Sequence, residues 1–501
     1  MNTEVIALLA LPFLPLVAGF ALVGGGRWPR AVTATTAFAL AALTTVATVA
    51  LSILVAVERP SLDRQWVQSL GLRFHLGVDG ISIPLLVLTA AIGLLAVLHR
   101  RTEETTGSPA TYYGCLLIIV GGALLTFLAR DAILFFIAFE IVLVPMWVLI
   151  GVFGDRTDPA ATRRAALTFV LYTVLGSTLM LAGILALVFS AGTTDLTVLG
   201  RGVSMPAAQQ TAIAALLLAG LAVKVPLWPL HSWLPAAHTA APTGGSMLLA
   251  AVLLKLGTYG VVRLLVGPLG DGWRTLAPLV GVLAVIGIIW AGLVCLVEPS
   301  LKRVIAYSSV AHMGVVMLAL ATGTELGLRA ALFGNISHGI ISALLFAVAG
   351  GLKHRWHGDR LDVPRDAVRD VSPRLGFALL LGLAASLGLP ALAGFWAEFL
   401  TLLSAWQPAT DRTLFKVLAA FAALGAVLGA AYALRIARTA WAGSADRNER
   451  QLPDEAPWSD AHGLEWSVIA VLVVAVVVLG VWPTGLMDLM TPAIQQLGAL
   501  R

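Results

Sequence analysis

The stretch GLAVKVPLWPLHSWLPAAHTAAPTGG, residues 220–245, interrupts a predicted membrane helix with four prolines, a lysine and two histidines. Proline lacks an amide donor and clashes with the preceding turn, so Pro226, Pro229 and Pro235 predict a break in the helix. Irregular backbone at membrane depth is tolerated only where it faces protein or a water-filled cavity. The stretch therefore predicts a broken helix beside a polar path through the membrane.

The composition around this stretch is that of a membrane protein. Of 501 residues, 59% are hydrophobic and 12% are charged, and the mean hydropathy is +0.91. A helix of about 20 apolar residues crosses the hydrocarbon core, whereas the strands of a membrane β-barrel are ~10 residues of alternating pattern. The long runs predict an all-α polytopic membrane protein and exclude a barrel. Fourteen spans are expected, at residues 3–24, 31–57, 78–99, 111–128, 130–153, 162–190, 207–235, 243–266, 274–297, 301–322, 327–350, 375–405, 413–440 and 464–484.

Loop charge predicts how these spans are oriented. The odd-numbered loops contain 19 of the 32 lysines and arginines, and the even-numbered loops and the C-terminus contain 11. Positive residues mark the cytoplasmic side, and the number of spans is even, so both termini are expected on the outer face. The N-terminal apolar run has no basic flank and is too long for a signal peptide, so it is expected to be the first span.

A second interruption, GLPALAG at 388–394, cuts the twelfth span five spans after the break in the seventh. Breaks at corresponding places predict two repeats, spans 4–8 and 9–13, which are inverted because each has an odd number of helices. Inverted repeats with discontinuous helices are typical of transporters, with the ion site at the breaks. The expected organisation is N-terminal helices at 1–110, a first repeat at 111–266, a second repeat at 267–440, and a C-terminal loop and helix at 441–501.

Four formally charged residues fall clearly within the predicted spans, away from the span ends: Glu140, Lys224, Lys255 and Glu398. A charge at the bilayer centre costs about 2.5–3.5 kcal/mol or more, so each is a functional candidate; the alternative is a buried structural ion pair. The chain has five lysines and 27 arginines, yet both of these cations are lysine. Arginine suits a structural pair better and keeps its proton, whereas a buried lysine can release it. The choice of lysine favours a proton relay.

Four histidines extend the candidate path. His231 and His238 lie in the broken part of the seventh span, His312 in the tenth span and His338 in the eleventh. A single histidine in a helix is usually a core residue, but four in neighbouring spans favour a relay, because imidazole titrates near neutral pH. A metal site is not expected, since no cysteine or acidic ligand accompanies His231 and His238.

The sequence contains no nucleotide-binding or redox motif: no P-loop, no cysteine cluster and no glycine fingerprint between a strand and a helix. Cys115 and Cys295 lie in apolar runs and are expected to be small buried hydrophobic residues. No cofactor and no nucleic-acid partner are expected. The energy for transport therefore has to come through a partner protein.

Six motifs spread over nearly the whole chain occur in a specific combination. They are FHLGVDGIS (74–82), FFIAFEIVLVPMWVLIG (135–151), VKVPLWPLHSWLPAAHTAAPTGGSMLLAAVLLKLGTYG (223–260), LKRVIAYSSVAHMG (301–314), NISHGIISALLF (335–346) and SLGLPALAGFWAEFL (386–400). Together they resemble the antiporter-like subunit M family of the proton-pumping NADH:quinone oxidoreductase, respiratory complex I.

The resemblance implies a role for each charged residue. Glu140 and Lys224 are the pair of the input half, Lys255 is the central lysine that links the halves, and Glu398 is the terminal residue of the output half. Sibling subunits and sodium/proton antiporter subunits have lysine at the position of Glu398, so this glutamate favours subunit M.

Further expectations come from the same resemblance. His231, His312 and His338 match histidines of the family's polar axis. The chain is expected to pump protons with energy from quinone reduction in a distant arm, and to contain no redox centre. Its partners are other membrane subunits of complex I and the lipid bilayer, in the cell inner (plasma) membrane.

The sequence departs from the family pattern at two places and leaves rivals open. The acidic residue of WLPDAH is Ala236 here, and EAPT has become AAPT at 240–243; both changes remove negative charge and put the entry route in doubt. The rival functions are a subunit of a multisubunit sodium/proton antiporter, a subunit of a ferredoxin- or hydrogen-linked complex, and a structural membrane scaffold.

Overall fold

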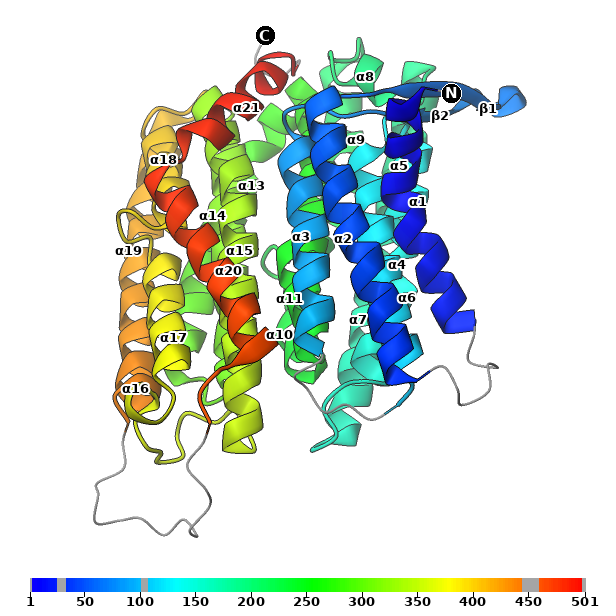
Figure 1. The fold of residues 1–501 in the computed structure, drawn as a ribbon. Helices are drawn as coiled ribbons and strands as arrows, with labels where there is room; N and C mark the ends of the chain where they lie inside the picture. Colours follow the sequence, from blue (N-terminus) through cyan, green and yellow to red (C-terminus); the bar gives the residue numbers. More distant parts are fainter. Residues whose placement is uncertain (1, 25–32, 101–106, 444–458, 498–501) are drawn as a thin grey trace.

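The computed structural model describes residues 2–24, 33–100, 107–443 and 459–497 (Figure 1). Five arginines that contribute to the predicted orientation, namely Arg27, Arg30, Arg101, Arg447 and Arg450, lie outside the described residues. The described chain is a bundle of helices, which confirms the all-α membrane fold.

The elements follow one another in this order: α1 (Thr3–Gly24), α2 (Ala34–Glu58), β1 (Leu62–Val67), β2 (Leu72–Leu76), α3 (Ser82–His99), α4 (Pro109–Leu128), α5 (Ala132–Ile141), α6 (Leu143–Gly151), α7 (Pro159–Ala191), α8 (Leu196–Leu199), α9 (Ala207–Lys224), α10 (Trp233–Ala240), α11 (Thr243–Leu248), η4 (Leu249–Leu253), α12 (Leu254–Gly260), η5 (Val261–Val266), α13 (Gly270–Val297), α14 (Leu301–Ala321), α15 (Glu325–Trp356), α16 (Val368–Val371), α17 (Pro373–Ser386), α18 (Ala393–Trp406), α19 (Arg412–Ile436), η6 (Ala437–Trp441), α20 (Gly463–Val481) and α21 (Thr484–Gln495). A single 3₁₀ turn, η2 (Gln68–Leu70), joins the two strands, and η4, η5 and η6 are π-helical.

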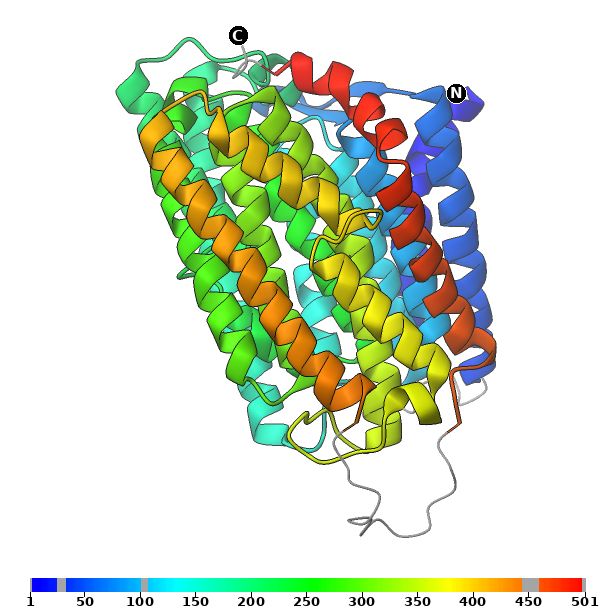
Figure 2. The ribbon, with the colours of Figure 1, turned by 90° about the vertical axis from the view of Figure 1, so that its left-hand side faces the viewer.

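The described residues contain 13 helical segments that are long and apolar enough to cross a membrane. Fourteen spans were expected, and the difference lies in the twelfth, 375–405. That span consists of two shorter helices, α17 and α18, separated by residues 387–392. Neither half has the length of a full span, although together they cross the bundle (Figure 2).

The polar helices lie inside the bundle, and the most apolar helices surround them. The most apolar window of α15 is 100% buried, and those of α4 and the segment from α11 to η5 are each 94% buried. In contrast, the windows of α2, α7, α19 and α20 are 33% buried, and large apolar side chains such as Leu43, Phe189, Val427 and Val481 are exposed on them. Exposed apolar side chains on these outer helices suit contact with lipid, whereas α15, which holds Asn335 and His338, is shielded from it.

The seventh span is also interrupted. Helix α9 ends at Lys224 and α10 begins at Trp233. Proline at 226 and 229 cannot donate an amide hydrogen bond, and the irregular segment is held instead by Leu227 N, which donates to Ala222 O at 2.9 Å. The indole Nε1 of Trp233 donates to Val223 O at 2.9 Å and ties α10 back to the end of α9.

The two ends of the bundle differ. The start of α1, the β1–β2 hairpin, α8 and α21 lie at one end, and the long loop from α15 to α17 lies at the other (Figure 1). The antiparallel hairpin and the amphipathic helix α21 were not predicted from the sequence. Helix α21 lies close over the loop before α3, because a Cβ at Gly80 would lie 2.1 Å from Leu489 O.

Candidate functional site

The first polar cluster lies between α5, α7 and the end of α9. Ser177 Oγ donates to Glu140 Oε1 at 2.5 Å. Lys224 is 4% exposed, and its Nζ lies 5.0 Å from the centroid of the Phe139 ring and 6.0 Å from that of Phe169. Lys224 and Glu140 attract one another electrostatically without a direct ion pair between these two described residues. The structure therefore brings the expected input pair into one cluster, with the carboxylate on a serine and the ammonium over aromatic rings.

The break after α9 sets the position of Lys224. Because the helix ends at this residue, its side chain lies at the negative end of the α9 dipole, which favours a cation. Aromatic faces attract a desolvated ammonium as well. The charge is thus stabilised without a direct carboxylate contact.

The centre of the axis is Lys255, at the start of α12. Its side chain is fully buried, with 0% exposure. It follows the π-helical segment η4 and donates from Nζ to Ala250 O at 2.6 Å, within its own helix. Short π-helical segments are frequent at functional sites. A Cβ at Gly257 would lie 3.2 Å from the carbonyl carbon of Lys224, so glycine lets α12 pack directly on the end of α9 and brings the two lysine-bearing elements together.

Lys255 contacts the second polar cluster through His338 of α15. The distance from Lys255 Nζ to His338 Nδ1 is 2.5 Å. An ammonium only donates, so in this contact Nδ1 accepts and a neutral His338 carries its proton on Nε2. That Nε2 is buried and has no hydrogen-bond partner among the described residues. The His338 ring packs against the His312 ring, with centroids 5.6 Å apart.

His312 of α14 connects His338 to Glu398 of α18. Its Nδ1 lies 2.7 Å from Ser308 O and its Nε2 lies 2.9 Å from Ser386 O. Carbonyl oxygens only accept, so both ring nitrogens donate, and this geometry fits the doubly protonated, cationic form. Glu398 Oε1 lies 3.7 Å from His312 Nε2 and supplies the counter-charge.

Gly388, in the break between α17 and α18, makes room for Glu398. Its φ is +65°, and a Cβ there would lie 2.5 Å from Glu398 Oε2. Left-handed backbone is strained for residues with a side chain. The motif GLPALAG therefore does two things: it interrupts the helix and it leaves space for the carboxylate beside the turn.

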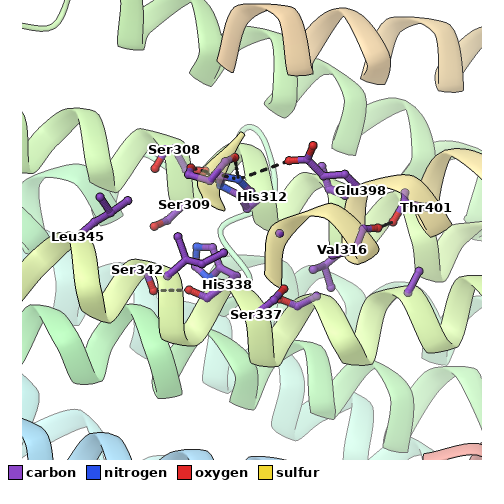
Figure 3. A pocket seen from close by; sticks show the side chains of 17 residues that line it. Ser308, Ser309, His312, Val316, Ser337, His338, Ser342, Leu345, Glu398 and Thr401 are labelled. Atoms are coloured by element: carbon purple, nitrogen blue, oxygen red, sulfur yellow. Dashed lines mark hydrogen bonds and ion pairs between the residues drawn. The ribbon is translucent and has the colours of Figure 1, made fainter. Parts of the chain in front are cut away.

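Hydroxyl groups line the space around this cluster. A small cavity has His312, His338 and Glu398 on its wall, together with Ser308, Ser309, Ser337, Ser342, Ser386 and Thr401 (Figure 3). A second small cavity shares His312, Ser386, Glu398 and Thr401 and extends between α13 and α19 to Tyr432. Hydroxyl groups donate and accept hydrogen bonds, so both cavities suit water molecules that bridge the titratable groups.

The structure joins four of the candidates, Lys255, His338, His312 and Glu398, into one chain of contacts. His231 is buried in the interrupted segment, but no contact links it to any other candidate within the described residues. His238, also buried, stacks on Phe346 with centroids 4.5 Å apart.

Sequence reasoning missed a charged cluster at the end of the bundle that contains the hairpin. Asp79 lies 2.6 Å from Arg263 Nη2 and 3.1 Å from Arg130 Nη1. Burial would raise the pKa of Asp79, but Arg130 and Arg263 outweigh it and hold this pKa well below its usual value. Arg263 falls inside the predicted eighth span but near its end, so it was not among the four charged candidates. The signal was present, since Asp79 belongs to the motif FHLGVDGIS.

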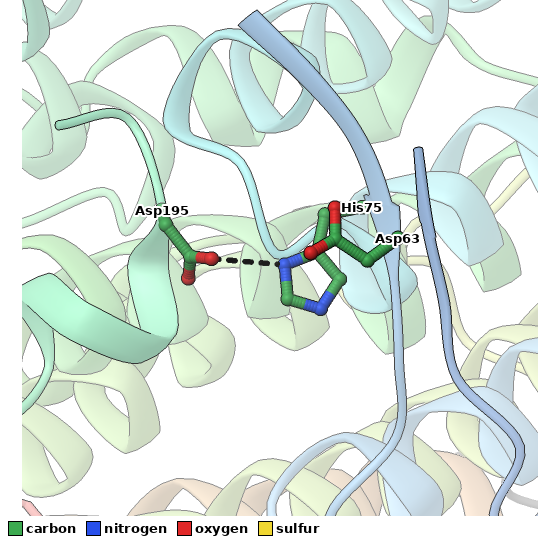
Figure 4. A group of neighbouring side chains, drawn as sticks. All are labelled: Asp63, His75 and Asp195. Carbon is green, nitrogen blue, oxygen red and sulfur yellow. Dashed lines mark hydrogen bonds and ion pairs between the residues drawn. The ribbon is translucent and has the colours of Figure 1, made fainter. Parts of the chain in front are cut away.

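A second group at this end has the composition of a metal site. Ligand atoms of Asp63, His75 and Asp195 lie within 4.8 Å of one another (Figure 4). Asp63 is already bound by the Arg73 guanidinium at 2.6 and 2.8 Å, and Asp195 pairs with His75 at 3.2 Å. A guanidinium on one ligand opposes a metal cation, so the group is better described as an ion-pair network that fastens the hairpin to the segment before α8.

Comparisons with known proteins agree with this architecture. Residues 129–426 match the family model described as NADH:quinone oxidoreductase/Mrp antiporter, TM. The chain is 35% identical to NADH-quinone oxidoreductase subunit M of Rhodobacter capsulatus, over 97% of this chain and 95% of that protein. It is 34% identical to an NAD(P)H-quinone oxidoreductase chain 4 of Trichormus variabilis, over 83% and 76%.

Solved structures extend the comparison. A chain of respiratory complex I from Thermus thermophilus superposes with a TM-score of 0.83 at 27% identity, over 98% of this chain and 100% of that chain. A chain of the Mrp complex from Dietzia sp. has a TM-score of 0.85 at 19% identity, over 100% of both chains, and shares the fold. This multi-pass membrane chain belongs to the NADH:quinone oxidoreductase/Mrp antiporter family of membrane subunits.

Proposed function

We propose that this chain is a proton-translocating membrane subunit of an NADH:quinone oxidoreductase. The contact between Lys255 Nζ and His338 Nδ1, 2.5 Å long and wholly buried, carries the proposal. It pairs a group that can release a proton with one that can accept it. A cation with a purely structural role would instead be expected to bind a carboxylate, or carbonyl oxygens alone. The similarity to subunit M of Rhodobacter capsulatus supports the same assignment.

The central transfer follows from the hydrogen-bond geometry. Lys255 gives a proton to Nδ1 of His338, so the lysine becomes a neutral amine and the histidine an imidazolium. His338 can then release the proton on Nε2 towards His312, once His312 has passed its own Nε2 proton to Glu398. The 3.7 Å between His312 Nε2 and Glu398 Oε1 exceeds a direct hydrogen bond, so this step needs a small approach of the two groups or one bridging water.

The input cluster acts on the centre by electrostatics. When Glu140 approaches Lys224 it holds the Lys224 proton, and when it withdraws the proton is free to leave. A proton on Lys224 also repels a proton on Lys255, because the two elements pack together at Gly257. Loading of the input half therefore favours release along His338, His312 and Glu398. A carboxyl is neutral when it carries a proton, so Glu398 suits the release step at the end of the chain.

The remaining assignments belong to the same proposal. Both termini face outward, which is supported by the position of α1 and α21 at one end of the bundle and of the arginine-rich loops at the other. Residues 111–266 and 267–440 form the two inverted repeats, between the N-terminal helices (1–110) and the C-terminal segment (441–501). The chain contains no redox centre, and the complex in the plasma membrane supplies the energy.

Two experiments test the proposal. An affinity tag on this chain should recover NADH- and quinone-reactive subunits; recovery of antiporter subunits alone would support the sodium/proton antiporter instead. In reconstituted vesicles, Glu140→Gln should lower proton pumping several-fold at matched quinone-reductase activity, without dependence on sodium. Normal pumping by Glu140→Gln would remove the input pair from the mechanism.

A further inference from the structure

A large cavity opens at the end of the bundle opposite to the chain termini. It lies between the loop after α6, the segment that joins α10 to α11, and the ends of α14 and α15. We call this cavity the vestibule. The charged and titratable residues on its wall are Asp155, Arg156, Lys302, Lys353, His354 and His357.

The vestibule is basic. Three lysine and arginine side chains and two histidines line it, and Asp155 is the one acidic residue among the described residues of its wall. A cavity lined by cations raises the electrostatic barrier to an entering proton, as arginines do in pores that exclude cations. One carboxylate in the vestibule offsets part of that barrier.

A backbone hydrogen bond holds Asp155 close to the broken seventh span. Its amide N donates to Ala240 O at 2.8 Å, and a Cβ on the preceding Gly154 would lie 2.8 Å from the same oxygen. The carboxylate accepts hydrogen bonds from Thr157 N and Thr157 Oγ1, both at 2.9 Å. It also forms an ion pair with Lys353 at the end of α15. Asp155 thus lies directly beside position 240, where the motif AAPT lacks an acidic residue.

Buried polar groups continue from the vestibule towards the centre of the axis. Lys302 is 2% exposed, and its Nζ donates to Ala241 O at 2.9 Å. His238 lies within electrostatic reach of both Lys302 and Lys255, and neither of its ring nitrogens has a hydrogen-bond partner among the described residues. His238 is therefore a buried titratable group that feels the charge of both Lys302, on the vestibule wall, and Lys255, at the centre of the axis.

We propose that Asp155 is the electrostatic positioning residue of the proton entrance: its fixed negative charge in the basic vestibule lets protons reach His238 and Lys255. The inference rests on the proposed function and adds an entrance to it. Burial would raise the pKa of Asp155, but Lys353 and Thr157 together lower it. Asp155 therefore stays ionised at neutral pH and acts by its charge, not as a carrier.

The test uses two variants that break the same ion pair but change the charge of the vestibule in opposite directions. Asp155→Asn makes it more positive and Lys353→Gln makes it less positive. Turnover-coupled pumping is measured in vesicles up to the alkaline pH at which proton supply limits the rate. Asp155→Asn should move this alkaline limit down, and Lys353→Gln should move it up, each by about 0.3 to 1 pH unit for one charge at ~10 Å.

A merely structural pair predicts a different result. If Asp155 only fastens the loop after α6 to α15, both variants lose activity alike and the alkaline limit does not move in opposite directions; that outcome overturns the inference. Asp362→Asn is the matched control, since Asp362 pairs with Arg360 at the same end but lies outside the vestibule wall.

A chemical variant covers the case in which Asp155→Asn folds poorly. Asp155→Cys is treated with a negatively or a positively charged thiol reagent, with the wild-type complex treated in parallel; Cys115 and Cys295 are buried. Only the negative label should restore the alkaline limit, and equal effects of both labels would refute the role of charge. Lys255→Arg is run alongside. If it assembles and pumps normally, the transfer from Lys255 to His338 that carries the proposed function fails; if it does not pump and the vestibule variants match wild type, only the entrance is wrong.

Discussion

The substitution Lys255→Arg separates a proton relay from a structural ion pair. Arginine keeps the positive charge and can donate to both Ala250 O and His338 Nδ1, the two partners of Lys255 Nζ. It cannot release its proton under physiological conditions. Free arginine holds its proton about three units more tightly than free lysine, which makes transfer to His338 about 10³-fold less favourable.

This difference in proton affinity predicts a large loss of pumping. About 10³-fold corresponds to ~4 kcal/mol on the transfer step, so pumping through this chain should fall below detection. The bulkier guanidinium adds about 1–3 kcal/mol of overpacking at a fully buried site, so assembly of the complex has to be checked by subunit recovery. Proton uptake is then measured in vesicles at matched quinone-reductase activity.

Lys416→Arg is the matched control, because Lys416 lies over the Trp406 ring, with its Nζ 5.1 Å from the centroid. Arginine preserves such a contact, so pumping should stay at the wild-type level. If Lys255→Arg assembles and pumps at the wild-type rate, Lys255 is a structural cation and protons bypass it.

Three other substitutions test separate parts of the axis. Ser177→Ala removes the 2.5 Å hydrogen bond to Glu140 and should lower pumping several-fold in vesicles while leaving the charge unchanged; an unaffected rate would mean that the serine does not position the carboxylate. Glu398→Gln should block release and lower pumping at matched quinone-reductase activity, and normal pumping would contradict its place at the end of the chain. Asp79→Asn leaves Arg130 and Arg263 without their carboxylate and should destabilise the fold by about 2–3 kcal/mol, less than for a fully buried pair because the Asp79 side chain is 28% exposed. Thermal unfolding of the purified complex measures this loss, which should occur without a specific loss of pumping; an unchanged midpoint would show that the cluster does not stabilise the fold.

Local sequence predicted the helices because the membrane imposes a local rule. A run of about 20 apolar residues becomes a spanning helix whatever its neighbours are, so most of the spans could be predicted from hydropathy. The prolines at 226 and 229 and the motif GLPALAG predicted segments without regular helix. The reason is equally local, because proline lacks an amide donor and clashes with the preceding turn. The hairpin at 62–76 and α21 were not predicted, since short strands and an amphipathic end helix have no apolar run long enough to cross a membrane.

The four charged candidates could also be named from the sequence, because any ionised group in a span is costly. The sequence could not predict which of these side chains contact one another in the folded chain. The contact of Lys255 with His338 joins residues 83 positions apart, and that of His312 with Glu398 depends on a glycine turn at 388. Asp79 and Arg263 are 184 positions apart. His231 was a candidate on the same sequence grounds as His338, but within the described residues it contacts none of the other candidates.

By itself the sequence determined the all-α membrane architecture, the interrupted segments, the family, and the identity of the four charged candidates, because each depends on residue type and local spacing. Only the tertiary structure decided which of the candidates contact one another, as Lys255 does His338, and the position of Asp155 beside position 240. Those depend on how closely helices pack, which is set by small residues such as Gly154, Gly257 and Gly388 in elements far apart along the chain. Close packing is a property of pairs of elements, and a single sequence carries no local signal for it.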